Sequence, residues 1–354
     1  MEFISEYGLF LLKTITLVGA IVLVIGAIAS ASSRNKNSAQ EGDIVIKRLN
    51  DDIEDYKDAF EDAILSKEEQ KALNKQRQKE EKAKAKAEKK RAKDGLESTE
   101  TRKRIFVLDF NGDVKASEVD LLRHEITAVL TQIEKEDEIV LRLESPGGMV
   151  HTYGLAASQL KRIRDKGVPL TICVDEVAAS GGYMMACLGN KIIAAPFALI
   201  GSIGVLAQVP NFHRLLKKND VDYELFTAGK FKRTVTMLGE NTDKGREKFQ
   251  SDLEETHTLF RQHVQKFRPR LDVDAVATGE VWYGQQALEN KLIDEVGTSD
   301  DYIVNACANA DVYSVRYEYK KTLQEKLGVG VQAAIEKAMT TVLNRIQQQN
   351  VSKS

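Results

Sequence analysis

The chain has 354 residues, more than one average domain and enough to bury a sizeable core. Hydrophobic residues make up 42% of it and the formal net charge is −2, so composition gives no global attraction to nucleic acid. Three cysteines, Cys173, Cys187 and Cys307, lack metal or redox spacing, and an odd number argues against a disulfide framework. We expect them to be small core residues of a globular protein.

The N-terminal region predicts a membrane anchor. Residues 14–33 carry no charge, and with Leu9–Leu12 the apolar stretch is long enough to cross a bilayer as a helix. A cleaved signal peptide is the alternative, since residues 29–31 (Ala-Ser-Ala) could serve as a cleavage site. The acidic tail and the long apolar run favour an uncleaved anchor. We therefore predict a short tail over 1–8 and a transmembrane helix over 9–33.

A charged spacer is expected over residues 34–103. Residues 51–62 contain seven Asp or Glu and one Lys, whereas residues 66–94 contain twelve Lys or Arg and six Asp or Glu. The second block consists mostly of Lys, Ala, Glu and Gln, which favour helix but offer little to bury. It is typical of a solvated helical or partly disordered spacer. Binding to lipid headgroups or nucleic acid is the sharper alternative, although interleaved aromatic residues are missing.

From residue 104 onward, strands alternate with helices, which predicts βαβ units and a largely parallel sheet in one α/β domain over 104–320. Apolar runs and helical spacing predict the following elements, with a C-terminal helix in the segment 321–354. Strands are expected at 105–110, 138–143, 168–174, 192–195, 204–209 and 223–226, and helices at 117–133, 149–164, 182–188, 243–267 and 321–347.

Ser180 lies at the predicted junction between the strand ending at Val174 and the helix over 182–188. Its neighbours Ala178, Ala179, Gly181 and Gly182 are small, which allows another backbone to approach closely. A helix N-terminus there would direct N–H groups toward developing negative charge. The junction suits a nucleophilic hydroxyl, and an N-cap role for Ser180 is the simpler alternative.

A second candidate element, Ser145-Pro146-Gly147-Gly148, follows a predicted strand directly. Such a turn can direct backbone N–H groups into a cleft at the carboxyl end of a sheet and so form an oxyanion hole. An ordinary turn explains the same residues.

A serine nucleophile needs a base. The five histidines, His124, His151, His213, His257 and His263, are scattered, and His151 near the glycine turn is the best placed. A lysine is an alternative, because burial disfavours the charged form; lowering a lysine pKa by ~3 units requires about 4 kcal/mol of differential solvation. The segment 229–234 (Gly-Lys-Phe-Lys-Arg-Thr) offers two such lysines, although a solvated basic turn has the same composition.

Taken together, the motifs resemble the signal peptide peptidase A-type serine peptidases, and the anchor and spacer resemble the SohB-like branch of that family. The resemblance covers residues 104–300 and, with the anchor and spacer, nearly the whole chain. The matching segments occur in the family's order: 145–148 (Ser-Pro-Gly-Gly), 179–183 (Ala-Ser-Gly-Gly-Tyr), 201–205 (Gly-Ser-Ile-Gly-Val), 229–232 (Gly-Lys-Phe-Lys), 279–287 and 292–297.

The resemblance implies a ClpP/crotonase-like α/β fold and a serine endopeptidase with a Ser/Lys dyad and an acyl-enzyme intermediate. Ser180 would be the nucleophile, Lys232 the general base and Ser202 the residue that orients the lysine. Gly147, Gly148 and Gly181 would line the oxyanion hole. Lys230 is the rival base. Relatives often carry an acidic residue directly after the catalytic lysine, where this chain has Arg233.

The family also implies a homo-oligomeric ring, in which serine and lysine come from neighbouring subunits, and a bacterial inner-membrane location. Peptides or membrane-associated protein fragments are the expected substrates, and no cofactor, metal or nucleic acid is expected. The side of the membrane stays open: the basic residues after the anchor favour the cytoplasm by the positive-inside rule, whereas the resemblance favours the periplasm. The alternative functions are a non-catalytic membrane scaffold on a peptidase fold and a crotonase-type acyl-CoA enzyme.

Overall fold

A seven-stranded sheet forms the centre of the computed structural model, which describes Thr16, residues 41–93 and residues 102–320. The strand order is β1-β10-β2-β3-β4-β6-β9, and the ladders from β10 to β9 are all parallel. The strands are β1 (Gly42–Arg48), β2 (Arg104–Asn111), β3 (Glu138–Glu144), β4 (Leu170–Val174), β6 (Lys191–Ala194), β9 (Glu295–Val296) and β10 (Asp311–Tyr319).

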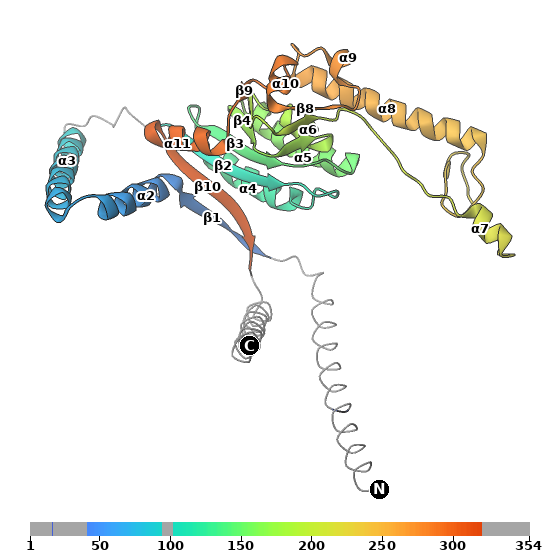
Figure 1. The fold of residues 1–354 in the computed structure, drawn as a ribbon, viewed down its shortest axis with the longest axis horizontal. Coiled ribbons are helices and arrows are strands. Elements are labelled where there is room, and N and C mark those ends of the chain that lie inside the picture. Colours follow the sequence, from blue (N-terminus) through green and yellow to red (C-terminus); the bar gives the residue numbers. More distant parts are fainter. Residues whose placement is uncertain (1–15, 17–40, 94–101, 321–354) are drawn as a thin grey trace, which may run out of the picture. The chain divides into compact units, whose positions relative to one another are not determined.

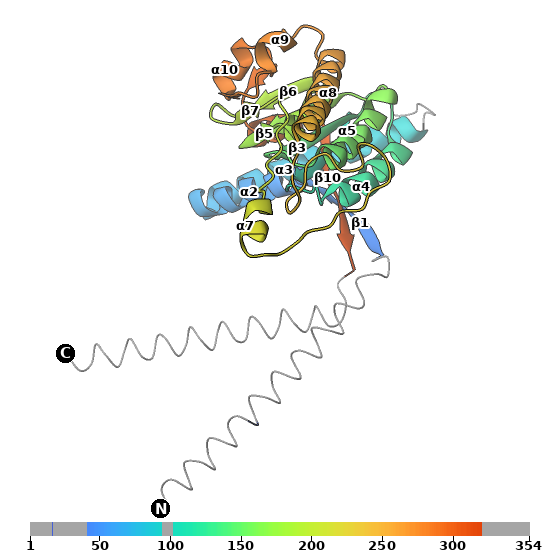
Figure 2. The same cartoon turned by 90° about the vertical axis from the view of Figure 1, so that its right-hand side faces the viewer.

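Helices cover both faces of this sheet (Figures 1 and 2). Successive side chains of a strand point to opposite faces, so Leu108 and Leu141 join one core and Val107 and Val140 the other. Helices α4, α5 and α6 pack on the first face, and α2 and α11 on the second. The helices are α2 (Leu49–Ile64), α3 (Lys67–Lys93), α4 (Val119–Gln132), α5 (Val150–Asp165), α6 (Gly181–Ala186), α7 (His213–Lys218), α8 (Asp243–Phe267), α9 (Val273–Val276), α10 (Gly284–Glu289) and α11 (Ser299–Asn309).

A second, three-stranded sheet carries the region around Ser180. Its order is β5 (Val177–Ala179), β7 (Leu199–Gly201), β8 (Val281–Tyr283), with β5 parallel to β7 and β7 antiparallel to β8. The chain enters it directly from β4 and leaves it into α6. Ser180 is the residue between β5 and α6, so its position is fixed by both elements.

Part of the expected spacer, residues 42–64, belongs to the folded structure. Residues 42–48 form β1 of the main sheet, and Asn50 at the start of α2 is buried. The Asn50 amide donates to the carbonyls of Cys307 and Ala310 and accepts from the N–H of Val312. The basic block forms helix α3, and Arg77 of α3 pairs with Asp58 and Glu61 of α2. The charged composition of this segment therefore hides a strand that packs against the first core through Ile44 and a helix that packs against the second through Leu49 and Ile53.

Eight predicted elements between residues 105 and 267 form close to their expected positions, namely β2, β3, β4, β6, α4, α5, α6 and α8. Two predicted strands are wrong: among the described residues, 204–209 and 223–226 adopt no strand. The first runs into residues 206–241, which we call the arm, and the second lies within them. The arm carries α7 and extends away from the sheets to the start of α8 (Figure 1). Its exposed apolar side chains produced a strand-like pattern without a core to pack against.

The cysteine prediction is confirmed, since all three cysteines are free and buried. The predicted tail, the anchor (Thr16 excepted) and the C-terminal helix lie outside the described residues. Among the residues that are described, no helix is long and apolar enough to span a membrane. Residues 41–43 and 318–320 fall in a small unit of their own, where the Lys320 N–H donates to the Glu41 carbonyl and Lys320 pairs with Asp43.

Candidate active site

Ser180 has a backbone conformation that residues other than glycine rarely adopt. Its φ is 51° and its ψ is −116°, although it is neither glycine nor asparagine. The conformation is held by two bonds: its N–H donates to Gly201 O (2.8 Å) and its carbonyl accepts from Met184 N–H (2.9 Å). Ser180 occupies the N-cap position of α6, but its hydroxyl makes no capping hydrogen bond. Strained backbone of this kind clusters at functional sites, and the simple capping role does not describe this serine.

The glycine turn lies directly against Ser180. The Ser145 N–H donates to Val177 O (2.7 Å), and its carbonyl accepts from Ala179 N–H (3.0 Å), so the turn runs beside β5. Gly147 has a φ of +88°, and a Cβ there would lie 2.7 Å from the Gly181 nitrogen and from Ser180 Cβ. A side chain would therefore displace the serine, which explains the glycine at this position.

Two of the three predicted oxyanion-hole amides are available. The Gly147 N–H donates to Ser145 Oγ (3.1 Å), which commits it to holding the turn. Within the part of the chain that the structure describes, no hydrogen bond is recorded from the N–H of Gly148 or Gly181. Gly181 is the first residue of α6, where N–H groups lack intrahelical acceptors. Gly148 and Gly181 are thus the better candidates for oxyanion donors.

A buried hydrogen-bond chain supports the turn. Gly147 N–H donates to Ser145 Oγ, Ser145 bonds the Tyr153 hydroxyl (2.6 Å), and Tyr153 donates to Asp113 O (2.7 Å). Burial raises the pKa of the Tyr153 hydroxyl, so it remains a neutral donor. A Cβ on Gly181 would lie 2.4 Å from the Tyr153 ring, so the ring also sets the position of α6. Sequence reasoning missed Tyr153, whose position in α5 looks like any core residue.

Glu144, another residue that sequence reasoning missed, fixes the start of β5. Its carboxylate accepts from the N–H groups of Asp175 (2.7 Å), Glu176 (3.0 Å) and Val177 (2.8 Å). Burial raises the pKa of the Glu144 carboxyl, and these three donors oppose that shift. The signal available in the sequence was a lone acid at the end of an apolar strand, directly before the glycine turn.

Ser202 lies next to the Ser180 backbone. Ala179 pairs with Gly201 across β5 and β7, and Ser202 follows with a φ of 50°. The Ser202 N–H donates to Glu280 O (2.6 Å), and Gly201 faces the Trp282 ring so closely that a Cβ would lie 2.8 Å from it. The segment 279–283 therefore supports Ser202 from β8. The structure brings Ser180, Ser202 and the three glycines together.

The lysines lie elsewhere. Lys230 and Lys232 are exposed on the arm, and Lys230 Nζ sits 5.1 Å from the Phe231 ring centroid. Phe231 also faces Lys248 near the start of α8. Further along this helix, His257 contacts Ile203 O beside Ser202, and His263 contacts Met184 O of α6. At 1.5 Å per residue, these two histidines lie about 14 and 22 Å from Lys248 along the helix axis. Among the contacts of the described residues, neither lysine reaches Ser180 within one chain.

The histidines offer no replacement that the described contacts support. His151 is exposed on the first turn of α5, and His213 is on α7 of the arm. His124 stacks on Tyr317 with ring centroids 4.3 Å apart. His257 and His263 contact backbone carbonyls, at Ile203 and Met184 respectively.

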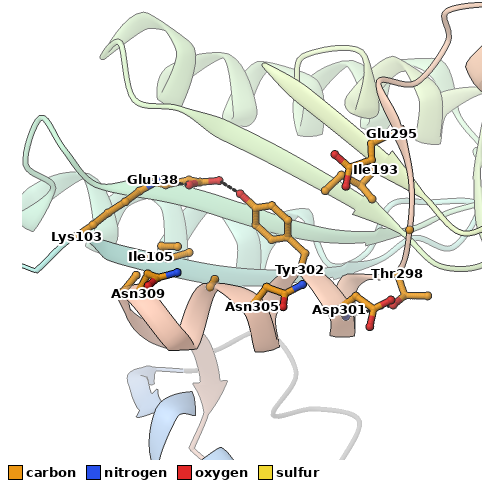
Figure 3. A pocket seen from close by; sticks show the side chains of 13 residues that line it. Lys103, Ile105, Glu138, Ile193, Glu295, Thr298, Asp301, Tyr302, Asn305 and Asn309 are labelled. Atoms are coloured by element: carbon orange, nitrogen blue, oxygen red, sulfur yellow. Dashed lines mark hydrogen bonds and ion pairs between the residues drawn. The ribbon is translucent and has the colours of Figure 1, made fainter.

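A cavity of about 290 Å³ lies between the sheet and α11 and contains none of the candidate residues (Figure 3). Its buried acid, Glu138, accepts from Lys103, Thr171 and Tyr302. These donors hold the pKa of the Glu138 carboxyl below its usual value despite burial, which by itself would raise it. The cluster is a satisfied structural network on the face that α11 covers.

Comparison with known sequences identifies the family. Residues 2–160 match the family described as peptidase family S49 N-terminal, and residues 162–313 match peptidase family S49. A probable protease SohB of Haemophilus influenzae is 53% identical over 329 residues, covering 92% of each chain. The chain belongs to peptidase family S49 and is a peptidase, a hydrolase with peptide or protein substrates.

More distant relatives agree. A putative protease SohB of Buchnera aphidicola subsp. Baizongia pistaciae is 40% identical over 350 residues, covering 98% of this chain and 97% of its own. A putative signal peptide peptidase SppA of Enterococcus faecium is 29% identical over 219 residues, covering 58% of this chain and 63% of its own. The mixed α/β fold is consistent with the ClpP-like fold expected for such a peptidase.

Proposed function

We propose that this peptidase is a membrane-anchored serine endopeptidase that works through a Ser180/Lys232 dyad and an acyl-enzyme. The observation that carries the proposal is the geometry of Ser180. Its hydroxyl makes no capping bond, its backbone is held in a left-handed conformation, and glycine N–H groups lie beside it. A serine that served only as an N-cap would make the capping hydrogen bond, and it would need neither the strained backbone nor the neighbouring glycine N–H groups.

In the proposed reaction, Ser180 Oγ attacks the scissile carbonyl while Lys232 Nζ takes its proton. The resulting oxyanion accepts from the N–H groups of Gly148 and Gly181. One such donor typically raises the rate of the chemical step by roughly 10²–10³-fold. The lysine then returns the proton to the leaving amine, and water hydrolyses the acyl-enzyme. Gly147 shapes the hole while its N–H holds Ser145. Ser202 orients the lysine.

In this proposal the base comes from a neighbouring subunit. A lysine serves as a base once its ammonium is desolvated, and Lys232 is exposed in the single chain. The arm that carries it exposes many apolar side chains, so it lacks a core of its own. They are Leu206, Val209, Phe212, Leu215, Val221, Tyr223, Leu225, Phe226, Phe231, Met237 and Leu238. Packing the arm onto a second copy would bury these side chains and bring Lys232 to that copy's Ser180, which supports a homo-oligomeric ring.

The apolar stretch over residues 9–33 would anchor the chain in the bacterial inner membrane. Substrates would then be membrane-associated or extended peptides, such as remnants of signal peptides. A periplasmic catalytic domain agrees with the family resemblance, although the flanking charges favour the cytoplasm. A reporter fused after residue 40 distinguishes these: activity confined to cytoplasmic reporters would overturn the periplasmic assignment.

The proposal is tested with a fluorophosphonate probe on the purified full-length oligomer, read by mass spectrometry. We expect the probe to label Ser180 in the wild type and in Lys230→Ala, and to label neither Ser180→Ala nor Lys232→Ala. An intact oligomer that does not label would favour the non-catalytic scaffold. Label retained in Lys232→Ala would move the base to Lys230 or His151.

A further inference from the structure

The two borders of the main sheet differ. One border is β9, which has two residues, and short edge strands are a common protection against pairing with other chains. The other border is β1, which has seven residues and lies beside β10 (Figure 1). Val45 and Ile46 of β1 are 43% and 60% exposed. A seven-residue edge strand with an exposed apolar centre can serve as a template for a further strand.

The outward peptide groups of β1 can be assigned from its contacts with β10. The Glu41 carbonyl, directly before β1, accepts from Lys320, directly after β10. Arg48 at the other end of β1 pairs with Asp311 at the start of β10, so the two strands run antiparallel. Peptide groups alternate in direction along a strand, so Ile44 and Ile46 turn theirs away from β10. These two residues would bond an added strand.

The sequence of β1 is complementary to itself. Read forward it is Gly-Asp-Ile-Val-Ile-Lys-Arg, with an acid and a base equally far from Val45. If two copies pair antiparallel with Val45 opposite Val45, then Asp43 of each lies opposite Lys47 of the other. Ile44 lies opposite Ile46, and these are the two residues with outward peptide groups. The same register thus pairs opposite charges, brings apolar side chains together and lets the outward peptide groups bond each other.

We propose that β1 is a homodimerisation strand, which joins the main sheets of two copies into one continuous sheet about a two-fold axis at Val45. The contact is isologous, with the same patch on both copies. It is separate from the arm and does not depend on catalysis. The ion pairs that Asp43 and Lys47 make within one chain, with Lys320 (3.3 Å) and Asp52 (2.7 Å), are exposed and easily exchanged.

Cysteine cross-linking of the full-length chain in membranes tests the register. The three native cysteines are buried, so background is low. In the proposed dimer, Val45 of one copy lies opposite Val45 of the other at a non-hydrogen-bonded position. The two Cα atoms would be about 4.5 Å apart, a distance that a disulfide can bridge. We expect Val45→Cys to give at least about tenfold more disulfide-linked dimer than Ile64→Cys, a control at a position 74% exposed on α2.

Two further pairs of variants make the test specific. Asp43→Cys and Lys47→Cys should each cross-link poorly alone and efficiently when co-expressed. In a Val45→Cys background, Asp43→Lys should lower the dimer yield by about 5- to 30-fold, and adding Lys47→Asp should restore it. Equal cross-linking by Ile64→Cys, efficient self-linking by Asp43→Cys, or no restoration by the double exchange would overturn the proposal. Probe labelling of Ser180 in Val45→Cys reports separately on the peptidase.

Discussion

The two halves of the proposed catalytic dyad lie in regions built in different ways. Ser180 is enclosed by a packed core: Ser145, Tyr153, Gly181 and Gly182 are buried, and hydrogen bonds fix the backbone on both sides. Lys232 lies on the arm, where Phe226 is 88% exposed and Leu206 is 79% exposed. One half is therefore organised within a single chain, whereas the other half would, in our proposal, gain its surroundings from assembly.

This difference separates stability from activity. Changes around Ser180 should affect folding and catalysis together, because the same contacts hold both. Changes on the arm should leave the single chain stable and reduce activity through the oligomer. Variants at Gly147, Tyr153 and Phe226 test that separation, and a variant at Glu125, which lies in neither region, should change stability alone.

Gly147→Ala should have the largest effect. The new Cβ would meet the Gly181 nitrogen and Ser180 Cβ at 2.7 Å, and φ of +88° disfavours alanine. We expect probe labelling of Ser180 to fall by ~10²-fold or more. The matched control is Gly154→Ala in α5, where a Cβ meets nothing within 4 Å, and labelling should be unchanged. Normal labelling of Gly147→Ala would show that the glycine turn does not position the serine.

Tyr153→Phe should have a moderate effect on both properties. It removes the hydroxyl that bonds Ser145 (2.6 Å) and Asp113 O (2.7 Å), so the buried Ser145 hydroxyl loses its acceptor, whereas Asp113 O keeps the bond from the Ala116 N–H. We expect a loss of about 1–2 kcal/mol in the free energy of unfolding and about tenfold slower labelling, because the turn loosens. Tyr56→Phe, at a position 65% exposed on α2, is the control for both measurements.

Phe226→Ser should change activity without changing the stability of the chain. Since the side chain is 88% exposed, the free energy of unfolding of the dissociated chain should change by less than ~0.5 kcal/mol. Sedimentation should show smaller assemblies, and peptidase activity should fall several-fold. Tyr56→Ser is the matched control outside the arm. Full assembly and activity in Phe226→Ser would remove the arm from the proposed subunit contact.

Glu125→Gln should alter the pH dependence of stability and leave activity unchanged. Burial, with smaller contributions from Asp109 and Glu118, raises the pKa of the Glu125 carboxyl from 4.5 to about 7. Between these values the folded state holds a proton that the unfolded state has lost, so wild-type stability should fall as pH rises toward 7.

Glutamine keeps an acceptor for the Tyr317 N–H, which now donates to Glu125 Oε1 (2.8 Å). Urea unfolding should therefore find the variant more stable than wild type by about 1–3 kcal/mol at pH 8 and nearly equal at pH 4.5. An advantage of the same size at both values would show that the carboxyl does not titrate between them.

The sequence predicted the packed half of the molecule better than the rest. Periodicity located the helix over 243–267 and the strands that flank the glycine turn, because their apolar residues face one core. It failed on the arm, since the exposed apolar residues there are spaced like those of a strand. It also missed β1, whose neighbours are charged. The left-handed backbone of Ser180 and the use of the Gly147 N–H by Ser145 depend on contacts between distant segments, which no local pattern encodes.

In our proposal, each active site takes its serine and its lysine from different subunits. The direct measurement is peptidase activity after co-expression of Ser180→Ala and Lys232→Ala chains, with mixed assembly verified by mass spectrometry. Each variant alone should be inactive. In random mixed rings, about a quarter of the sites would combine an intact serine with an intact lysine from the neighbour, so about a quarter of wild-type activity should return. Mixed oligomers that remain inactive would contradict the account.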